Sequence, residues 1–208
     1  WFDFSSDGDF LAVSDSIGRN VSRLNIFDLR KNQPIAEPLI FNQTTTQVQW
    51  IPSSNVIVTS NNLGKLTFVH ASAFASPNPL TASIHAHSAL VWSMQCNDRI
   101  LVSGGGDSMV NVWDANHLNC LVSFSTADNS VRSVSISSDG QVIASAYEKE
   151  ISLHSKQGHK VGSINASIWT VAWHPTRPII AFGGESHSKK ENGKYYGQAS
   201  VVKFESDR

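Results

Sequence analysis

The sequence predicts an all-β fold, a β-propeller in which one four-stranded unit is repeated around a central channel. The first observation is an internal repeat, because one segment pattern occurs five times with its matched residues 46, 46, 40 and 37 positions apart. The second is the period, since about 40–45 residues is the length of a four-stranded blade. The third is that the segments alternate at period two and show no convincing helical periodicity.

Each repeat opens with two apolar strands joined by a polar turn. The five copies read WFDFSSDGDFLAVS, VQWIPSSNVIVTS, MQCNDRILVSGG, VSISSDGQVIASA and VAWHPTRPIIAFGG, and their first strands end at Phe4, Trp50, Cys96, Ile136 and Trp173. The segments are rich in Val, Ile and Ser and are interrupted by Asp-Gly or Pro, which is typical of strands and turns. Asp7-Gly8 and Asp139-Gly140 are therefore interpreted as hairpin turns rather than as acid–base pairs.

A third apolar strand follows in every repeat, and it reads LNIFD, LTFVH, VNVWD, ISLHS and VVKFE in turn. We therefore divide the chain into one array of five units, approximately residues 1–43, 44–88, 89–128, 129–166 and 167–208. The sequence starts within a first strand and stops after a third strand, which would leave unpaired sheet edges. We expect five blades of a seven-bladed propeller, with N-terminal blades missing and the last blade's fourth strand supplied from that missing region.

The unit from 86 to 114 matches the WD-repeat pattern best. His87 stands where the repeat's Gly-His pair would be, Asp107 precedes Trp113 by six positions, and Trp113-Asp114 is the WD pair itself. In WD repeats four such side chains form a buried hydrogen-bond chain. The expected structural tetrad is His87, Ser103, Asp107 and Trp113. The other units carry Phe27, Phe68, His154 and Phe204 at the tryptophan position and lack the full set.

The stretch SGGGDSMVNVWD, residues 103–114, raises two enzymatic alternatives. A phosphate-binding loop would need GxxxxGK[ST], and here Asp107 follows the glycines and would repel a phosphate. Ser103, His87 and Asp107 could form a hydrolytic triad, since triads are recognised by geometry and not by order. We favour the structural tetrad, and we interpret the glycines as allowing a close strand approach and a turn with positive φ.

Composition excludes several other functions. The formal net charge is −1, so no global field draws the chain toward nucleic acid or an anionic membrane, whereas direct RNA binding favours a basic stripe. No apolar run approaches the roughly 20 residues that span a bilayer. Cys96 and Cys120 stand apart, which argues against a disulfide framework and indicates a reducing compartment. A metal site at His85 and His87 is a disfavoured alternative, and we predict no catalytic, cofactor-binding or metal-ligating residue.

Two surfaces are candidates for partner binding. The starts of the first strands are expected at one rim of the central channel, where Trp92, Arg132 and Trp169 share a register with Thr46. Trp and Arg are enriched at binding hot spots, although these indoles could instead fill the channel mouth. The insert ESHSKKENGKYY in the last unit supplies Lys189, Lys190, Lys194 and Tyr195, and a solvated loop is the alternative there.

The whole chain resembles the WD-repeat subunit of the THO complex, the core of the TREX mRNA-export assembly. The resemblance rests on AWHPTRPIIAF in the last unit, on Gly193-Lys194-Tyr195 in its insert followed by VVKF, and on SIHAH and WDANHLNCLVSF around the third unit. Two segments depart from the family, because SDSIGRNVSR in the first unit is longer and YEKEISLHS in the fourth is one residue short. The divergence is expected of a fungal member.

The resemblance implies a nuclear, non-enzymatic scaffold that couples transcription elongation to mRNA packaging and export. Its partners would be the helical THO subunits, with which it would form a hetero-oligomer. The DEAD-box RNA helicase and mRNA would be contacted mainly through these partners, and no membrane contact is expected. One alternative is a substrate receptor of a ubiquitin ligase, because FDLR at 27–30 resembles the WDxR box that docks propellers onto a ligase adaptor. A propeller hydrolase is the remaining alternative.

Overall fold

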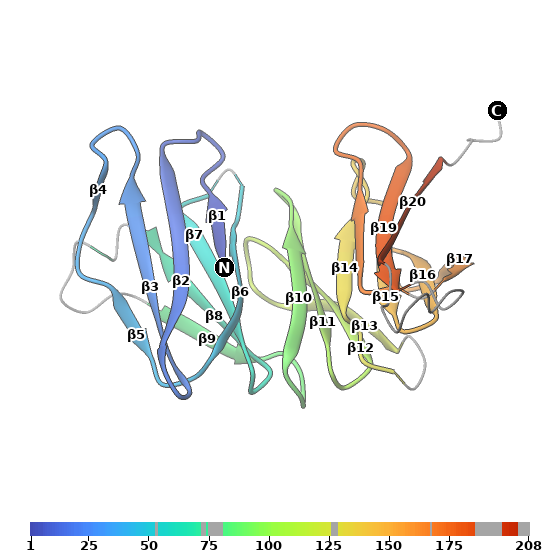
Figure 1. Cartoon of the computed structure of the whole chain (residues 1–208), viewed down its shortest axis with the longest axis horizontal. Helices are drawn as coiled ribbons and strands as arrows, with labels where there is room; N and C mark the ends of the chain where they lie inside the picture. Colours follow the sequence, from blue (N-terminus) through green and yellow to red (C-terminus); the bar gives the residue numbers. More distant parts are fainter. Residues whose placement is uncertain are drawn as a thin grey trace, which may run out of the picture.

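The computed structural model describes residues 1–52, 54–71, 74, 81–125, 129–166, 168–185 and 197–203. These residues form twenty β-strands in five separate antiparallel sheets, and no α-helix occurs among them. The all-β prediction is therefore confirmed. Each sheet is one blade, and its neighbouring strands follow the order of the chain, except that β5 pairs with β3 (Figure 1).

Blade 1 contains β1 (Phe2–Phe4), β2 (Phe10–Gly18), β3 (Val21–Asp28), β4 (Gln33–Pro34) and β5 (Leu39–Phe41). Blade 2 contains β6 (Thr45–Trp50), β7 (Val56–Asn61), β8 (Lys65–His70) and β9 (Thr81–His85). Blade 3 contains β10 (Val91–Cys96), β11 (Ile100–Gly105), β12 (Met109–Asp114) and β13 (Cys120–Ser125). Blade 4 contains β14 (Ser133–Ile136), β15 (Val142–Tyr147), β16 (Glu150–Ser155) and β17 (Lys160–Asn165). Blade 5 contains β18 (Thr170–Trp173), β19 (Ile179–Glu185) and β20 (Gly197–Lys203).

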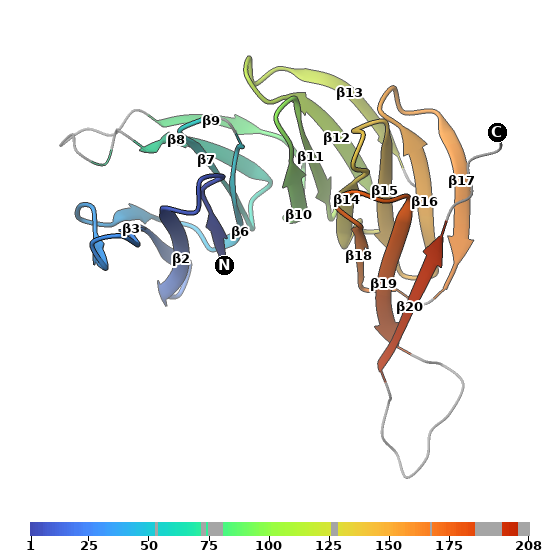
Figure 2. The same cartoon turned by 90° about the horizontal axis from the view of Figure 1, so that it is seen from above.

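The blades form an open arc with their first strands on the inner side. Figure 2 shows β10, β14 and β18 following one another along the inside, while β13 and β17 lie on the outside. This arrangement brings the ends of the first strands from neighbouring blades to a common rim. The sheets of blades 2, 3 and 4 have four strands, whereas three strands are described in blade 5.

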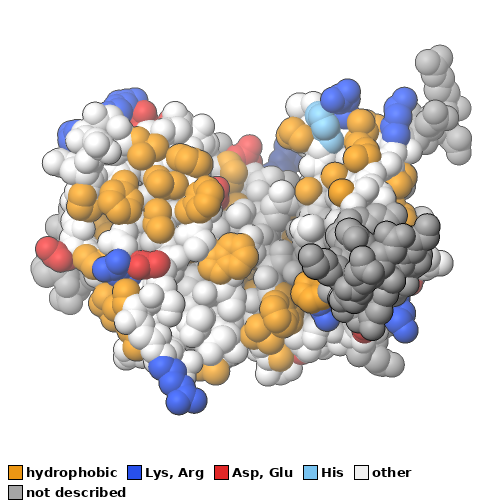
Figure 3. All heavy atoms as spheres, viewed as in Figure 1, with side chains coloured by type: hydrophobic (Ala, Val, Ile, Leu, Met, Phe, Trp, Pro, Cys, Tyr) orange, Lys and Arg blue, Asp and Glu red, His pale blue; other side chains and the backbone are white. Residues whose placement is uncertain are grey.

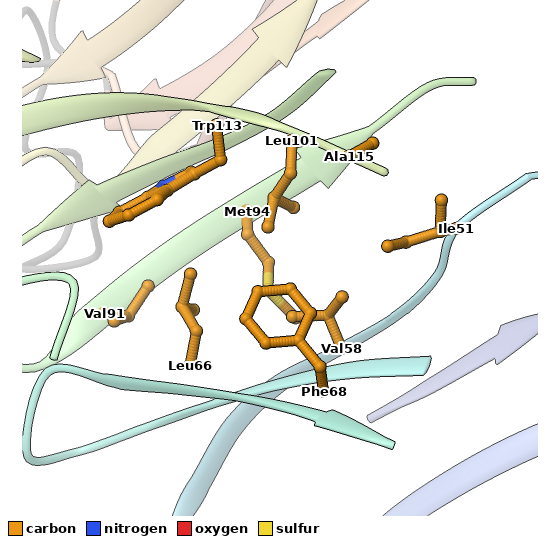
Figure 4. Packing of buried hydrophobic residues seen from close by; sticks show 9 residues of the cluster. All are labelled: Ile51, Val58, Leu66, Phe68, Val91, Met94, Leu101, Trp113 and Ala115. Carbon is orange, nitrogen blue, oxygen red and sulfur yellow. The ribbon is translucent and has the colours of Figure 1, made fainter. Parts of the chain in front are cut away.

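Apolar side chains fill the space between consecutive blades. Between blades 2 and 3, Leu66 and Phe68 belong to one buried cluster with Met94, Leu101 and Trp113 (Figure 4). Because successive residues of a strand point to opposite faces, each inner blade contributes to two such clusters. The alternating sequence pattern thus produces a stack of blades whose cores lie between the sheets.

The register corrects two of the positions matched to Trp113. In blade 3, Trp113 pairs with Leu101 of β11. In blade 2 the residue that corresponds to Leu101 is Ile57, and it pairs with Val69, not with Phe68. Phe68 is therefore on the other face of the strand, where it contacts blade 3 instead of blade 1. A shift of one residue reverses the face of a strand, which explains the error. In blade 5 the residue opposite Ile180 is Val202, and Phe204 lies outside the described residues.

The long excursion expected in the first unit is an extension of the hairpin. Strands β2 and β3 remain paired from Phe10 to Gly18, and Asn20 in the turn has a φ of 58°. Asn tolerates this left-handed conformation better than most residues. Near the tip, Arg23 Nε lies 2.8 Å from Asp15 Oδ1, so an exposed ion pair connects the two strands.

A ladder of side-chain acceptors connects the first strands of neighbouring blades. Gln95 Oε1 accepts a hydrogen bond of 2.6 Å from the Ile136 N–H, and Gln47 Oε1 accepts one of 2.6 Å from the Met94 N–H. Each acceptor lies on one first strand, and its donor is a backbone N–H on the inner edge of the next. Among the described residues, the pairs are Asp3–Trp50, Gln47–Met94, Ser93–Val134, Gln95–Ile136, Ser133–Val171 and Ser135–Trp173. The ladder satisfies N–H groups that have no neighbouring strand.

Candidate docking surface and the blade 3 network

The four tetrad residues are joined by hydrogen bonds in blade 3. His87 Nδ1 lies 2.9 Å from Asp107 Oδ1, and His87 Nε2 lies 2.8 Å from Ser103 Oγ. Trp113 Nε1 donates to the same hydroxyl at 3.0 Å. The chain of bonds therefore runs from the Asp107 turn through His87 and Ser103 to the indole, and it connects the loop before β10 with strands β11 and β12.

The protonation states of the network follow from its surroundings. Burial lowers the pKa of His87, and the hydrogen bond to Asp107 offsets this effect only in part. Burial raises the pKa of Asp107, but the hydrogen bonds from His87 and from the Ser88 N–H outweigh it and leave the pKa lowered. A neutral His87 then donates from Nδ1 to the carboxylate and accepts from Ser103, which in turn accepts from Trp113.

Gly104 and Gly105 lie so close to neighbouring side chains that a larger residue would not fit at either position. A Cβ atom on Gly105 would lie 2.3 Å from His87 Nδ1 and 2.4 Å from Asp107 Oδ1. A Cβ on Gly104 would lie 2.5 Å from the side chain of Val131 in the loop before blade 4. The expected close approach is therefore present. The left-handed residue of the turn is Ser108, with a φ of 65°, and not one of the three glycines.

The network is poorly arranged for nucleophilic catalysis. A hollow of about 580 Å³ adjoins it, lined in part by His85, Asp107 and Trp113. Ser103, however, is 0% exposed, and its hydroxyl already bonds to both His87 and Trp113. A substrate carbonyl would have to displace the indole to reach this oxygen. The arrangement can hold the loop and two strands together, and the hydrolase reading finds no support in it.

The rim residues Trp92, Arg132 and Trp169 lie at the starts of the first strands of blades 3, 4 and 5, and we call these three the rim triad. Arg132 Cζ is 4.4 Å from the centre of the Trp169 ring, a cation–π contact. Trp92 is 45% exposed and Trp169 is 53% exposed. All three residues line a hollow of about 400 Å³ at the channel, together with Trp1. Thr46, in the same register, bonds through Oγ1 to Ser60 Oγ at 2.9 Å.

The other candidates for partner binding are placed as follows. Lys189, Lys190, Lys194 and Tyr195 lie outside the described residues. In the FDLR turn, Arg30 is exposed and pairs with Asp9 of the same blade, with Arg30 Nε 2.6 Å from Asp9 Oδ1. The guanidinium is therefore paired within blade 1 while the side chain remains exposed, and docking of this turn onto a ligase adaptor stays a prediction.

The described part of the chain contains no group of three His, Cys, Asp or Glu residues placed to hold a metal ion. Burial raises the pKa of the Cys96 thiol to about 12, so this sulfur is protonated at neutral pH and is a poor metal ligand. Within the same described ranges, no helix has the length and apolar character needed to cross a membrane.

Sequence comparison identifies the repeat type and similar proteins. The model of the WD domain, G-beta repeat, matches residues 78–114 and 118–155. The chain is 28% identical over 194 residues to THO complex subunit 3 of Arabidopsis thaliana, which covers 91% of this chain and 59% of that protein. It is 27% identical over 201 residues to WD repeat-containing protein AAC3 of Dictyostelium discoideum, covering 92% of this chain and 40% of that protein.

Solved structures show the same fold at low sequence identity. A chain in the crystal structure of the mitotic checkpoint complex aligns with a TM-score of 0.76 and 16% identity, covering 97% of this chain and 66% of the other. The RRP9 WD40 repeats align with a TM-score of 0.74 and 13% identity, covering 88% and 58%. With the five antiparallel sheets, these comparisons show that the fold is a WD-repeat β-propeller array.

Proposed function

We propose that this chain is a docking subunit of a nuclear THO-type complex, which couples transcription elongation to mRNA packaging and export within a TREX assembly. Its direct partners are helical subunits in a hetero-oligomer. The DEAD-box helicase and mRNA are reached mainly through those subunits. The chain contributes binding surfaces and no catalytic step.

The observation that carries this proposal is the similarity to THO complex subunit 3 along 91% of the chain. A match of that extent includes all five blades and not only the two that fit the general WD-repeat model. The fold alone would not support this function, because propellers serve many unrelated functions.

The rim triad is the part of the surface that we assign to docking. Two partly exposed indoles and a guanidinium from three consecutive blades converge on one hollow. Trp and Arg account for a large share of binding energy at protein interfaces, especially around a pocket. The surrounding backbone is rigid because it belongs to strands connected by the acceptor ladder.

Affinity purification of the intact protein from nuclear extract, followed by quantitative mass spectrometry, tests this function. We expect helical THO subunits in near-equal molar amounts and the helicase in smaller amounts. Changing Trp92 and Trp169 to Ser should reduce that recovery by about tenfold, because hot-spot residues dominate an interface. The matched control changes Leu121 and Val161 to Ser, since both are exposed apolar residues on outer strands.

The contrary result is purification without any helical THO subunit. Recovery of a ubiquitin-ligase adaptor instead, with loss of that adaptor in Arg30→Ala, would establish the receptor alternative. Normal recovery in the rim variant would remove the rim triad from the docking surface while leaving the THO assignment intact.

A further inference from the structure

We propose that the rim triad binds a segment of a protein partner in which a carboxylate stands beside an aliphatic side chain. The carboxylate pairs with Arg132, and the aliphatic group contacts the indoles of Trp92 and Trp169. This inference rests on the proposed function, because it names the chemistry of the partner that the docking surface takes.

The first step concerns the charge of Arg132. Among the described residues that line the 400 Å³ hollow, Arg132 is the only one with a charged side chain. No ion pair joins Arg132 to a carboxylate among the described residues, so its charge is available to a ligand. A guanidinium held over an indole keeps N–H groups at its edge for an acceptor, and a carboxylate fits two of them at once.

The second step concerns the wall of the hollow. Gln47, Gln95 and Ser135 line it, and each already accepts a hydrogen bond from a backbone N–H of the next blade. These side chains are neutral and their acceptor oxygens are engaged, so they do not compensate the charge on Arg132. The hollow therefore presents one fixed cation in a neutral setting, and a ligand with a single negative group complements it.

The third step concerns the two indoles. Each indole leaves about half of its residue surface exposed to water, 45% for Trp92 and 53% for Trp169. Burying such apolar surface favours association, and Trp side chains lose little conformational entropy because they are stiff. Aliphatic groups of the ligand that pack on these rings would remove apolar surface from water.

A nucleic acid complements this surface less well than a peptide does. Phosphodiester backbones carry one charge per nucleotide, and the proteins that bind them supply several cations. Among the described residues that line the hollow, Arg132 carries the single cationic side chain, while the indoles alone would give stacking without backbone neutralisation. A short acidic–aliphatic peptide satisfies the cation and the apolar surface together.

Fluorescence anisotropy with the intact protein tests this inference, using three fluorescein-labelled probes. The first is a C-terminally amidated heptapeptide with one Glu between two Leu in a Gly-Ser background, the second replaces that Glu with Gln, and the third is an oligouridylate of similar length. We expect the Leu–Glu peptide to bind about tenfold more tightly than the Leu–Gln peptide, because charge-assisted hydrogen bonds are about twice as strong as neutral ones.

Three variants assign the contribution of each part. Arg132→Gln should abolish the preference for the Leu–Glu peptide and leave the weak Leu–Gln binding unchanged. Trp169→Leu should weaken both peptides. Arg99→Gln is the matched control, since it removes an exposed cation from the turn at the far end of β10 and changes the net charge equally. Circular dichroism confirms that each variant keeps the strand content of the parent.

Equal binding of the two peptides, no binding of either, or tighter binding of the oligouridylate overturns the inference. An undiminished preference in Arg132→Gln overturns it as well. These failures differ from failure of the proposed function, because co-purification of helical THO subunits is measured separately and does not depend on the peptide probes.

Discussion

At the scale of single residues, the blade 3 network shows how a set that resembles a catalytic triad can be structural. The Asp107–His87–Ser103 distances of 2.9 and 2.8 Å fall in the catalytic range. The fourth residue, Trp113, distinguishes this network from a catalytic triad. Its indole N–H donates a hydrogen bond to the Ser103 hydroxyl, which a nucleophile would need free. We therefore interpret the tetrad as a connection between the loop before β10 and the body of blade 3.

Loss of one partner from the tetrad should destabilise the chain. We expect Asp107→Ala to lower the free energy of unfolding by about 2–4 kcal/mol, because it leaves His87 Nδ1 and the backbone N–H groups of Ser88 and Met109 without their hydrogen-bond acceptor. Trp113→Ala should cost a similar amount through lost core volume, whereas Trp113→Phe, which loses little beyond the indole N–H, should cost about 1 kcal/mol. Denaturant unfolding measures all three, and an unchanged midpoint in both alanine variants would refute the structural interpretation.

His154 occupies the tryptophan position of blade 4 and should make the fold sensitive to acid. Burial lowers its pKa, and its buried Nδ1 has no hydrogen-bond partner among the described residues. Its ring is centred 4.4 Å from that of Phe124 in blade 3. Because the unfolded chain takes up a proton near the ordinary value of 6.5 and the folded chain does so only at lower pH, stability declines as pH falls through that value.

His154→Phe should therefore raise the free energy of unfolding by about 1 kcal/mol at neutral pH and reduce its decline between about pH 7.5 and pH 5.5. Part of the decline should remain, since the pKa of His87 is lowered too. Thermal melts across this range provide the measurement, with the exposed His159→Gln as control. The idea fails if the substituted protein and the parent show the same pH dependence.

At the scale of elements, the acceptor ladder explains how isolated sheets hold a fixed register with one another. The first strand of each blade is an edge strand, and side chains of the preceding blade satisfy its inward N–H groups. Gln and Ser supply most of the acceptors, and Asp3 supplies the one for Trp50. Burial raises the pKa of Asp3, while the Trp50 N–H favours the charged form.

Removing one acceptor of the ladder should destabilise the interface between two neighbouring blades. We expect Gln95→Leu to lower the free energy of unfolding by about 1–3 kcal/mol, because the Ile136 N–H loses its acceptor at 2.6 Å. Hydrogen exchange should show faster exchange at Ile136 than elsewhere in β14. Gln141→Leu is the matched control at an exposed glutamine. Equal effects of the two substitutions would show that the ladder contributes nothing.

Much of this fold was predictable from sequence, and the reasons differ from feature to feature. The spacing of Phe4, Trp50, Cys96, Ile136 and Trp173 predicts the blades, because strand alternation and turn residues are local signals. The residue of each unit that corresponds to Trp113 was harder to predict. An error of one position in blade 2 selected Phe68, whose side chain lies on the other face of the strand, in place of Val69. The expected seven blades and fungal origin stay predictions.

The candidate site was predictable only in part. The matched register of Trp92, Arg132 and Trp169 indicates a shared rim, but the contact of Arg132 with the Trp169 ring depends on the angle between two blades. The acceptor ladder was missed, although a signal exists in the alternate polar residues of TTQVQW, WSMQC and RSVSI. Recognising it requires knowing that each such side chain reaches the neighbouring blade.

At the scale of the whole molecule, the described blades leave one apolar sheet face open. Phe2 and Phe4 of β1 and the paired residues Leu11 and Phe27 share the face of blade 1 that points away from blade 2. Hydrophobic side chains gather over β2 and β3 in Figure 3. The equivalent face of blade 2, with Ile57 and Val69, is covered by blade 1.

An open face of this kind should cause self-association of the 208-residue chain by itself. Sedimentation velocity at increasing protein concentration should show dimers or larger species. Changing Phe4 and Phe27 to Ser should shift the population to monomer, whereas changing the exposed Leu63 to Ser should leave it unaltered. A parent chain that stays monomeric at every concentration would contradict this expectation.

Site-specific photocrosslinking in the assembled complex tests the central claim most directly. A benzophenone amino acid replaces Thr170, which is exposed and lines the hollow without belonging to the rim triad. A second protein carries it at Leu121 on the outer strand β13. We predict that position 170 crosslinks to a helical THO subunit and that position 121 does so far less. Crosslinking of position 121 alone, or of position 170 to a ligase adaptor, would contradict the account.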